Sequence, residues 1–245
     1  MCGERAAAEV IDFRNQRILI IAPHPDDEVL GCGGLIARAK REGAKVFVLY
    51  LTVGTIRDFS KRGRSTAAER TRELERVARF LRFDGWRIAF VGNDYHMRLD
   101  TLAQKDIIHE IERGEKISLE VLRPTLLLMC HPHDYNQDHR QAASAAIAAT
   151  RPGNVYKHLQ RHVLAYENPT NSWMVAETQP LLNFFVELKR EDFAAKVKAL
   201  SLYRSQMKHP QSIVSPAAVT ALARLRGMQS GVALAEAFEA KRFLI

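Results

Sequence analysis

Residues 22–31, APHPDDEVLG, gather one histidine and three acids directly behind a short apolar run, Arg17–Ala22. A turn that needed only polar character could use Ser, Asn or Gly. Acids this close repel one another unless a positive charge lies among them. Histidine nitrogen and carboxylate oxygen are ligands of a catalytic zinc, which is usually held by three protein groups and one water. The stretch therefore indicates a cation site, in which His24 and Asp27, three positions apart, can point the same way.

A second cluster of such side chains, HPHDYNQDHR, occupies residues 131–140 behind another apolar run. Each member has an ordinary explanation, either as a loop histidine or as an acid at a helix N-terminus. In a parallel sheet, however, the carboxyl ends of the strands meet at one edge, where ligands bind. Two clusters at matching strand ends are improbable by chance, so we expect the second cluster to supply a third metal ligand.

Apolar runs alternate with amphipathic stretches along the whole chain. Strands are predicted at residues 17–22, 45–52, 86–92, 125–131, 162–167 and 183–189. Helices are predicted at 28–42, 65–81 with Ser65 as the cap, 102–122 with a break near Gly114, 139–151, 191–206 and 217–228 behind Ser215 and Pro216. This alternation predicts an α/β fold with a mostly parallel central sheet covered by helices on both faces. We expect a single domain over 1–245, with about 210–245 as a C-terminal helical appendage.

The composition limits the class of protein. The 245 residues carry a net charge of +8 and a pI of about 9.6, which would suit nucleic acid, anionic lipid or a phosphorylated substrate. The charges are spread out, however, and the densest cluster, 57–76, has interleaved acids typical of a surface helix. No stretch of 18 apolar residues predicts a membrane span, and the N-terminus lacks the apolar core of a secretory signal. The odd, scattered set Cys2, Cys32 and Cys130 suggests free thiols in a reducing cytoplasm.

A glycine-rich stretch, GCGG at 31–34, raises the alternative of a dinucleotide-binding loop. It lacks the G-x-G-x-x-G spacing, and three acids come before it where a pyrophosphate would approach. We therefore expect Gly33 and Gly34 to allow close packing of the first helix on the sheet.

PHPDDEVLGCGG together with the later DYNQDHR resembles the LmbE-like, or PIG-L, family of zinc-dependent N-acetylglucosaminyl de-N-acetylases. The resemblance extends to RTREL (70–74), YENPTNSW (166–173), KALSLYRSQ (198–206) and AEAFEAKR (235–242), so it covers most of the chain. The PHPDDE element is highly specific and the later blocks are less so. The family implies a Rossmann-like fold and hydrolysis of the acetamide of an N-acetylglucosamine-type conjugate.

Carried over by position, the resemblance implies His24, Asp27 and His139 as zinc ligands and Asp26 as the general base for a metal-bound water. One departure concerns the general acid. Several family members have a histidine three residues before the third ligand, and this chain has Asn136, which cannot transfer a proton near neutrality. Protonated Asp26 could serve instead, or His133 or His131 could reach in. Asp138 could orient a histidine or Asp26.

The resemblance also implies contacts to a sugar. Arg70 matches a sugar-binding arginine, although an exposed helix arginine paired with Glu69 or Glu73 is an equal alternative. Asp94 could accept bonds from hydroxyl groups or stand in a turn, and Asn136 could donate to the substrate. Tyr166, Glu167 and Trp173 could line the acceptor side.

Several assignments stay open from sequence. Two nitrogens and one carboxylate suit divalent transition metals other than zinc. The aglycone, whether phosphorylated, nucleotide-linked or lipid-linked, and a homo-oligomeric state are undetermined. A metal-dependent phosphoesterase is the first alternative function, although such sites often hold two metals and need more ligands. A basic nucleic-acid-binding module is the second, and it lacks a dense basic face with aromatic residues.

Overall fold

The computed structural model describes residues 11–58, 63–153, 157–171, 181–207 and 211–244. Within them, a seven-stranded sheet has the order β5-β2-β1-β6-β7-β9-β8. The strands are β1 (Arg17–Ala22), β2 (Lys45–Val53), β5 (Gly85–Val91), β6 (Leu126–Cys130), β7 (His162–Tyr166), β8 (Phe184–Glu187) and β9 (Ala235–Phe243). A separate two-stranded ribbon pairs β3 (Ile56–Arg57) with β4 (Arg64–Ser65).

The first five strands of the sheet run parallel, and the expectation of a mostly parallel α/β sheet is confirmed. β6 is buried throughout, β1 from Ile18 and β2 through most of its length, as continuous apolar runs predict for strands covered on both faces. After β1 the chain adds β2 and β5 on one side, then returns to place β6 on the other. The strand order therefore reverses between β1 and β6, and ligands bind at such a point.

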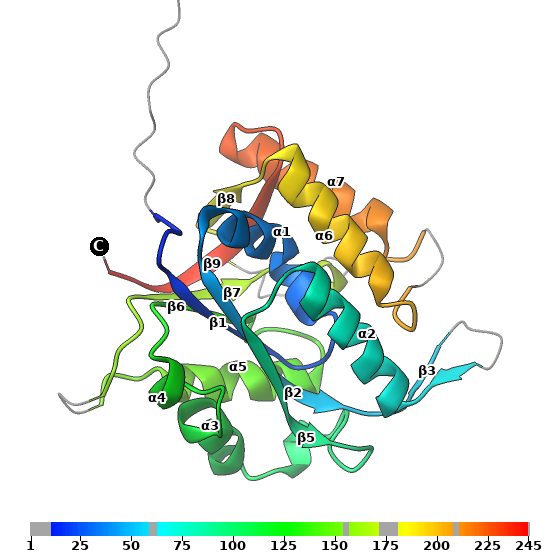
Figure 1. Ribbon diagram of the computed structural model, residues 1–245, viewed down its shortest axis with the longest axis vertical. Coiled ribbons are helices and arrows are strands. Elements are labelled where there is room, and N and C mark those ends of the chain that lie inside the picture. The colour runs from blue at the N-terminus through cyan, green and yellow to red at the C-terminus, as the bar shows by residue number, and fades with distance from the viewer. Residues whose placement is uncertain (1–10, 59–62, 154–156, 172–180, 208–210, 245) are drawn as a thin grey trace, which may run out of the picture.

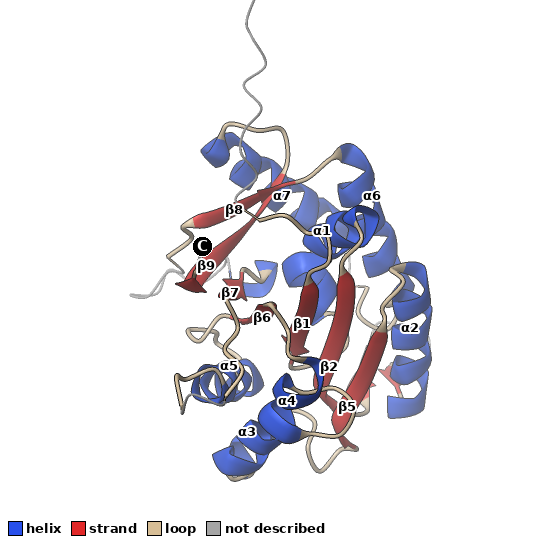
Figure 2. Ribbon diagram, turned by 60° about the vertical axis from the view of Figure 1, so that its left-hand side comes forward, coloured by secondary structure: helices blue, strands red, loops and turns tan. Residues whose placement is uncertain are grey.

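Helices cover both faces of this sheet (Figures 1 and 2). One layer contains α1 (Asp27–Glu42), α2 (Ala67–Phe80), α6 (Arg190–Leu202) and α7 (Pro216–Ser230), and the other contains α3 (Gln104–Arg113), α4 (Leu119–Leu122) and α5 (Gln137–Ala149). No helix of the described residues combines the length and apolar character that crossing a bilayer requires.

Local caps fix where the helices begin. Ser215 caps α7 with Pro216 at its first position, as predicted. α2 is instead capped by Thr66, whose hydroxyl accepts the amide of Glu69 while the Glu69 carboxylate accepts the amide of Thr66, a complete capping box. Asn136 caps α5 by accepting the amide of Asp138, so α5 begins two residues earlier than predicted and includes Asp138 and His139. The cap therefore places these two side chains in the first turn of α5.

The C-terminal region differs from the expected helical appendage. Only its first half is helical, as α7, and Ala235–Phe243 forms β9. β9 pairs antiparallel with both β7 and β8, so it is an internal strand of the main sheet. Its Ala, Glu and Lys residues favour a helix locally. Pairing with strands on both sides and the burial of Phe238 override this local preference for helix.

An internal strand should tolerate side-chain truncation poorly. We expect Phe238→Ala to lower the free energy of unfolding by about 3–5 kcal/mol, because it empties a fully buried site. Phe80→Ala, at a position that is 42% exposed near the end of α2, should cost far less. Urea denaturation of the two variants measures the difference, and equal losses would contradict an internal β9.

Candidate active site

A pocket of about 190 Å³ opens at the carboxyl edge of the sheet, where β1 and β6 diverge. The loop after β1, the start of α1 and the start of α5 contribute to its wall, together with α2 and the segment after β5. Its charged and polar lining comprises His24, Asp26, Asp27, Arg70, His96, Asn136, His139, Thr170 and Gln206. Ile56, Met97, Tyr135, Leu30 and Val214 form its apolar part. The two sequence clusters therefore meet in one cavity.

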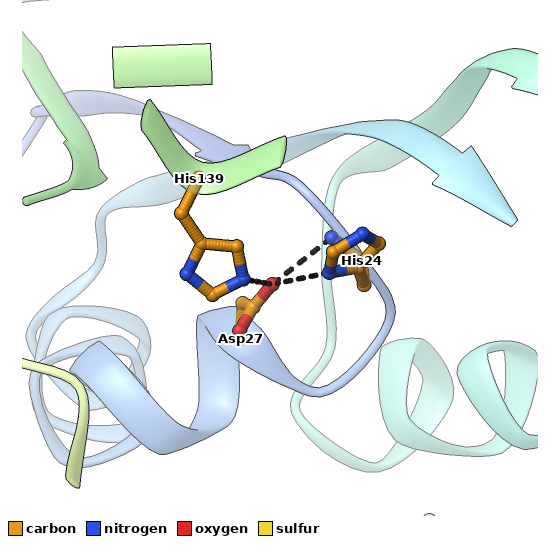
Figure 3. Close-up of side chains that lie close together, drawn as sticks. All are labelled: His24, Asp27 and His139. Atoms are coloured by element: carbon orange, nitrogen blue, oxygen red, sulfur yellow. Dashed lines mark hydrogen bonds and ion pairs between the residues drawn. The ribbon is translucent and has the colours of Figure 1, made fainter. Parts of the chain in front are cut away.

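His24, Asp27 and His139 converge on a single point (Figure 3). One ligand atom from each lies within 4.8 Å of the other two, and all three residues are buried. Asp27 Oδ2 lies 3.4 Å from His24 Nδ1 and 3.2 Å from His139 Nε2. The same oxygen accepts the backbone amide of His24 at 3.0 Å, so the turn after β1 fixes its position. Two nitrogens and one carboxylate oxygen at these separations could hold a metal ion.

Further side chains hold the three residues from behind. His24 Nε2 lies 2.9 Å from Asp138 Oδ2, and Asp138 Oδ1 accepts the amide of Leu99. His139 Nδ1 lies 2.7 Å from Asp134 Oδ2. Each imidazole thus has a carboxylate on the nitrogen that faces away from the convergence point, which orients metal-binding histidines and raises their basicity. The donor set fits a divalent cation, and Asp138 contacts His24, one of the partners that the sequence left open for it.

The charges of Asp27 and His139 determine which of the two side chains carries a proton. Burial raises the pKa of Asp27, but the charge of His139 and hydrogen bonds from His139 and His24 outweigh it and hold this pKa below its usual range. Burial lowers the pKa of His139, yet Asp27 and Asp134 raise it to about 10. Without a bound cation, a proton on His139 therefore supplies the positive charge that the acids require.

Asp26 adopts an unusual backbone conformation, with φ 116°. This left-handed region is costly for a residue with a side chain, and such strain concentrates at functional sites. The amide of Asp26 donates to the Glu28 carboxylate at 3.1 Å, and Tyr203 donates to the same carboxylate at 2.6 Å. Burial and the charge of Asp27 raise the pKa of Asp26 well above its usual value, while Arg70 opposes this.

Arg70 is 2% exposed, so the alternative of an exposed helix arginine is wrong. Glu69 belongs to the capping box, and Glu73 accepts the amide and hydroxyl of Ser205. Arg70 Nη1 donates to Gly54 O and to His96 Nε2, at 3.1 and 2.9 Å. Its Nε is buried without a hydrogen-bond partner among the described residues. Arg70 is also one of the residues that line the pocket.

His96 is a pocket residue that sequence reasoning missed. A guanidinium can only donate, so His96 Nε2 accepts and Nδ1–H donates to Thr52 Oγ1 at 3.2 Å. Burial, with the charges of His24 and Arg70, lowers the pKa of His96 to about 3. A Cβ on Gly54 would lie 2.4 Å from the Cβ of His96, so glycine is needed at that point. The available signal was its position directly after a strand that ends at the ligand-binding edge.

Other expected residues lie outside the pocket. His133 is exposed, and its ring stacks near His131, which pairs with Glu239 of β9. Asp94 is exposed in the turn after β5. Neither residue is among those that line the pocket.

The expected acceptor-side residues do not line the pocket either. The Tyr166 hydroxyl is buried and donates to Ile21 O, and the Glu167 carboxylate pairs with Arg226 of α7. Trp173 lies outside the described residues. Cys32 and Cys130 are buried free thiols, as expected, and Cys2 also lies outside the described residues.

A sequence profile described as PIG-L, GlcNAc-PI de-N-acetylase, matches residues 19–150. This span is more than half of the chain and contains both clusters. The chain belongs to the PIG-L family. The resemblance inferred from PHPDDE and DYNQDHR is thereby confirmed. The prediction that the chain belongs to a family of deacetylases is confirmed with it.

Relatives of this PIG-L protein support the same class. YaiS of Escherichia coli K12, named an uncharacterized deacetylase, is 26% identical over 78% of this chain and 92% of its own length. A diacetylchitobiose deacetylase of Thermococcus kodakarensis is 26% identical over 78% of this chain and 70% of its own length. The crystal structure of the conserved protein TT1542 from Thermus thermophilus superposes with a TM-score of 0.67 and 26% identity, covering 94% of this chain and 96% of that one.

The two histidines of the second cluster should differ sharply in their effect on metal binding. We expect His139→Ala to weaken affinity for a divalent cation by about 100-fold or more, since one of three ligands is lost. His133→Ala is the matched control, because it removes an exposed imidazole from the same loop. Competition with a chromophoric chelator measures both affinities, and an unchanged affinity in His139→Ala would exclude it as a ligand.

Metal binding should also release a proton. Below a pH of about 10 the cation-free chain carries a proton on His139, which must leave before Nε2 can bind a metal. We expect about one proton released per ion at pH 7, and apparent affinity that rises about tenfold per pH unit towards pH 9. Calorimetry in buffers of different ionisation enthalpy counts the protons, and none released would contradict a protonated His139.

Proposed function

We propose that this PIG-L protein is a zinc-dependent hydrolase that removes the acetyl group from an N-acetylglucosamine-type conjugate. The observation that carries the proposal is the convergence of His24, Asp27 and His139 in one buried cluster, with a carboxylate behind each imidazole. The named activity of the diacetylchitobiose deacetylase supports an N-acetylated sugar as the substrate class. Fold alone would not, because one fold hosts many reactions.

In this proposal His24 Nδ1, Asp27 Oδ2 and His139 Nε2 hold the ion. A zinc ion would supply Lewis-acid chemistry there, polarising the acetamide carbonyl and making a water acidic enough to lose its proton to a carboxylate. Another divalent transition metal would offer the same chemistry. Asp138 and Asp134 keep the imidazoles oriented throughout.

Asp26 is the proposed general base. It is the neighbour of Asp27 in sequence and lines the pocket, where its carboxylate faces the cavity that the substrate would enter. Burial and the charge of Asp27 raise the pKa of Asp26, which makes its carboxylate a stronger base than an ordinary aspartate. The same carboxylic acid can then protonate the departing amine, which Asn136 cannot do. One residue thereby serves as base and then as acid.

Arg70 and Asn136 are the proposed substrate contacts. Arg70 is buried beside His96 and lines the pocket, so its guanidinium is placed to donate to a substrate oxygen there. Asn136 uses its oxygen to cap α5, which leaves its amide N–H₂ to face a ligand, with only a 3.9 Å contact to Met97 sulfur. We give no role to His133 or Asp94, because both lie outside the pocket.

A two-metal phosphoesterase fits less well. Among the described residues, His24, Asp27 and His139 form the one group of three or more ligand-type side chains that could hold an ion. A second metal, about 3.5–4 Å from the first, would require further ligands of its own. One ion per chain by elemental analysis is therefore expected, and two tightly bound ions would favour the phosphoesterase.

The reaction is tested by acetate release from a panel of N-acetylglucosamine conjugates, with and without a chelator. We expect metal-dependent release by the wild-type chain. Asp26→Asn should retain the metal and lose kcat by about 10² or more, the scale of general-base catalysis. Asp94→Asn, which neutralises an exposed aspartate outside the pocket, should retain full activity.

Two outcomes would contradict the proposal in different ways. Full activity in Asp26→Asn would remove Asp26 from the mechanism and leave the reaction intact. No acetate release from any conjugate, by wild-type chain that has bound its ion, would instead reject the reaction.

A further inference from the structure

Helix α1 is interrupted one turn after the cluster of acids. Cys32 has φ −144° and ψ 25°, which are not helical values, so α1 consists of two helical pieces joined at this residue. The first piece carries Asp27 and Glu28, and the second runs to Glu42 alongside α6 (Figure 1). Sharp breaks of this kind have identifiable causes, such as a side chain inserted into the ladder of helix hydrogen bonds.

Two charged side chains from elsewhere in the fold occupy the interruption. Lys196 of α6 donates from Nζ to Leu30 O at 2.8 Å, and Glu236 of β9 accepts the amide of Gly34 at 2.9 Å. In an uninterrupted helix the Gly34 amide would donate to Leu30 O. Lys196 and Glu236 are themselves joined at 2.6 Å. The ion pair thus stands between two groups that a regular helix would bond to each other.

Glu236 also caps the second piece of α1. Its other carboxylate oxygen accepts the amide of Leu35 at 2.7 Å, so one side chain binds two successive amides at the start of the second piece. A helix N-terminus favours a carboxylate, which Glu236 supplies to the second piece. A helix C-terminus favours a cation, which Lys196 supplies at the Leu30 carbonyl of the first piece. The pair therefore satisfies the backbone on both sides of the break.

The glycine-rich stretch makes this insertion possible. A Cβ on Gly33 would lie 3.0 Å from Lys196 Cγ, and one on Gly34 would lie 2.4 Å from Leu188. A Cβ on Gly31 would lie 2.2 Å from the buried ring of Tyr166. Gly33 and Gly34 were expected to allow packing on the sheet. Gly34 does approach the sheet, where a Cβ would lie 3.1 Å from Glu236 of β9, whereas Gly33 approaches Lys196 of α6. These contacts explain a run of glycines that fits no dinucleotide loop.

Stability does not account for a buried ion pair at this place. Lys196 and Glu236 are 4% and 5% exposed, and replacing such a pair by apolar side chains is often neutral or stabilising. The pair lies where the two pieces of α1 meet. Asp27 in the first piece must reach His139 at 3.2 Å, while the second piece follows α6. The break at Cys32 therefore lies between the piece that carries Asp27 and the piece that packs on α6.

We propose that Lys196 and Glu236 are positioning residues for the metal site: together they hold α1 open between Leu30 and Gly34 and so aim Asp27 at His24 and His139. This inference rests on the proposed function only in requiring that the cluster binds a cation. It does not depend on which amide the enzyme hydrolyses.

The test is the double variant Lys196→Met with Glu236→Gln, which removes both charges together and leaves no unpaired buried ion. Without the ion pair between them, the Leu30 carbonyl and the Gly34 amide can bond to each other and straighten α1. We expect the variant to fold and its affinity for zinc to fall about tenfold or more, as when partners that orient a ligand are lost. Chelator competition at fixed pH measures the affinity.

Asp192→Asn is the matched control. Asp192 is 2% exposed and pairs with Arg41 at 2.9 Å, so it also links α6 to α1, but beyond the break. It should lower the thermal unfolding midpoint without changing zinc affinity by more than about twofold. Lys196→Arg, which keeps the charge and the donor, should retain most of the affinity that the double variant loses. If Lys196 and Glu236 only stabilised the fold, the double variant and Asp192→Asn would change zinc affinity to the same extent.

Each outcome decides the inference. A folded double variant with wild-type zinc affinity would overturn it, as would an equal loss in Asp192→Asn. If the double variant does not fold, amide exchange in the wild-type chain takes its place: Gly34 and Leu35 should be protected, and rapid exchange would show that the insertion does not form. Zinc binding without acetate release would reject the reaction and leave this inference standing, whereas no zinc binding by the wild-type chain would reject both.

Discussion

The site depends on a buried carboxylate, that of Asp27, and on how its charge is compensated. An ionised acid removed from water costs several kcal/mol unless it is paired and hydrogen-bonded. Asp27 Oδ2 receives the His24 amide and faces both imidazoles, and Oδ1 accepts from Asn168 at 3.0 Å. These partners come from the loop after β1, from α5 and from the segment after β7. These segments meet at the carboxyl edge of the sheet, where the strand order reverses between β1 and β6, so the topology and the charge compensation support each other.

The strands and helices that could be predicted are those whose own short stretch of sequence indicates their structure. Continuous apolar runs identify β1, β2 and β6 because both faces of these strands are buried, and caps such as Ser215 mark helix starts. β9 could not be found this way. Its sequence, AEAFEAKRF, uses residues that favour helix, and its first four residues are buried, so no alternation of apolar and polar residues remains. Pairing with β7 and β8 decides its structure, and such pairing is not visible in a single segment.

The same distinction separates the site residues. His24 and Asp27 are three apart in one turn, and His139 stands in a second cluster at an equivalent strand end, so their meeting follows from topology. His96 depends on a close approach across Gly54, and the burial of Arg70 depends on what packs against α2. Asp94 was chosen from the correct loop, two residues before His96. The strand end was therefore predictable, whereas the path of the turn that follows it was not.

Net charge is a poor guide to this site, and the reason is spatial. The chain carries +8, yet the pocket holds Asp26 and Asp27 with Arg70 as the one lysine or arginine among its described lining residues. A bound divalent cation would replace the proton on His139 as the positive charge next to Asp27. His96 adds no charge, because it accepts from Arg70 and its pKa is lowered to about 3. The basic surplus lies elsewhere on the surface and cannot be read as evidence for an anionic group at the reacting centre. Two carboxylates against one guanidinium make this pocket a poor place for a phosphate group.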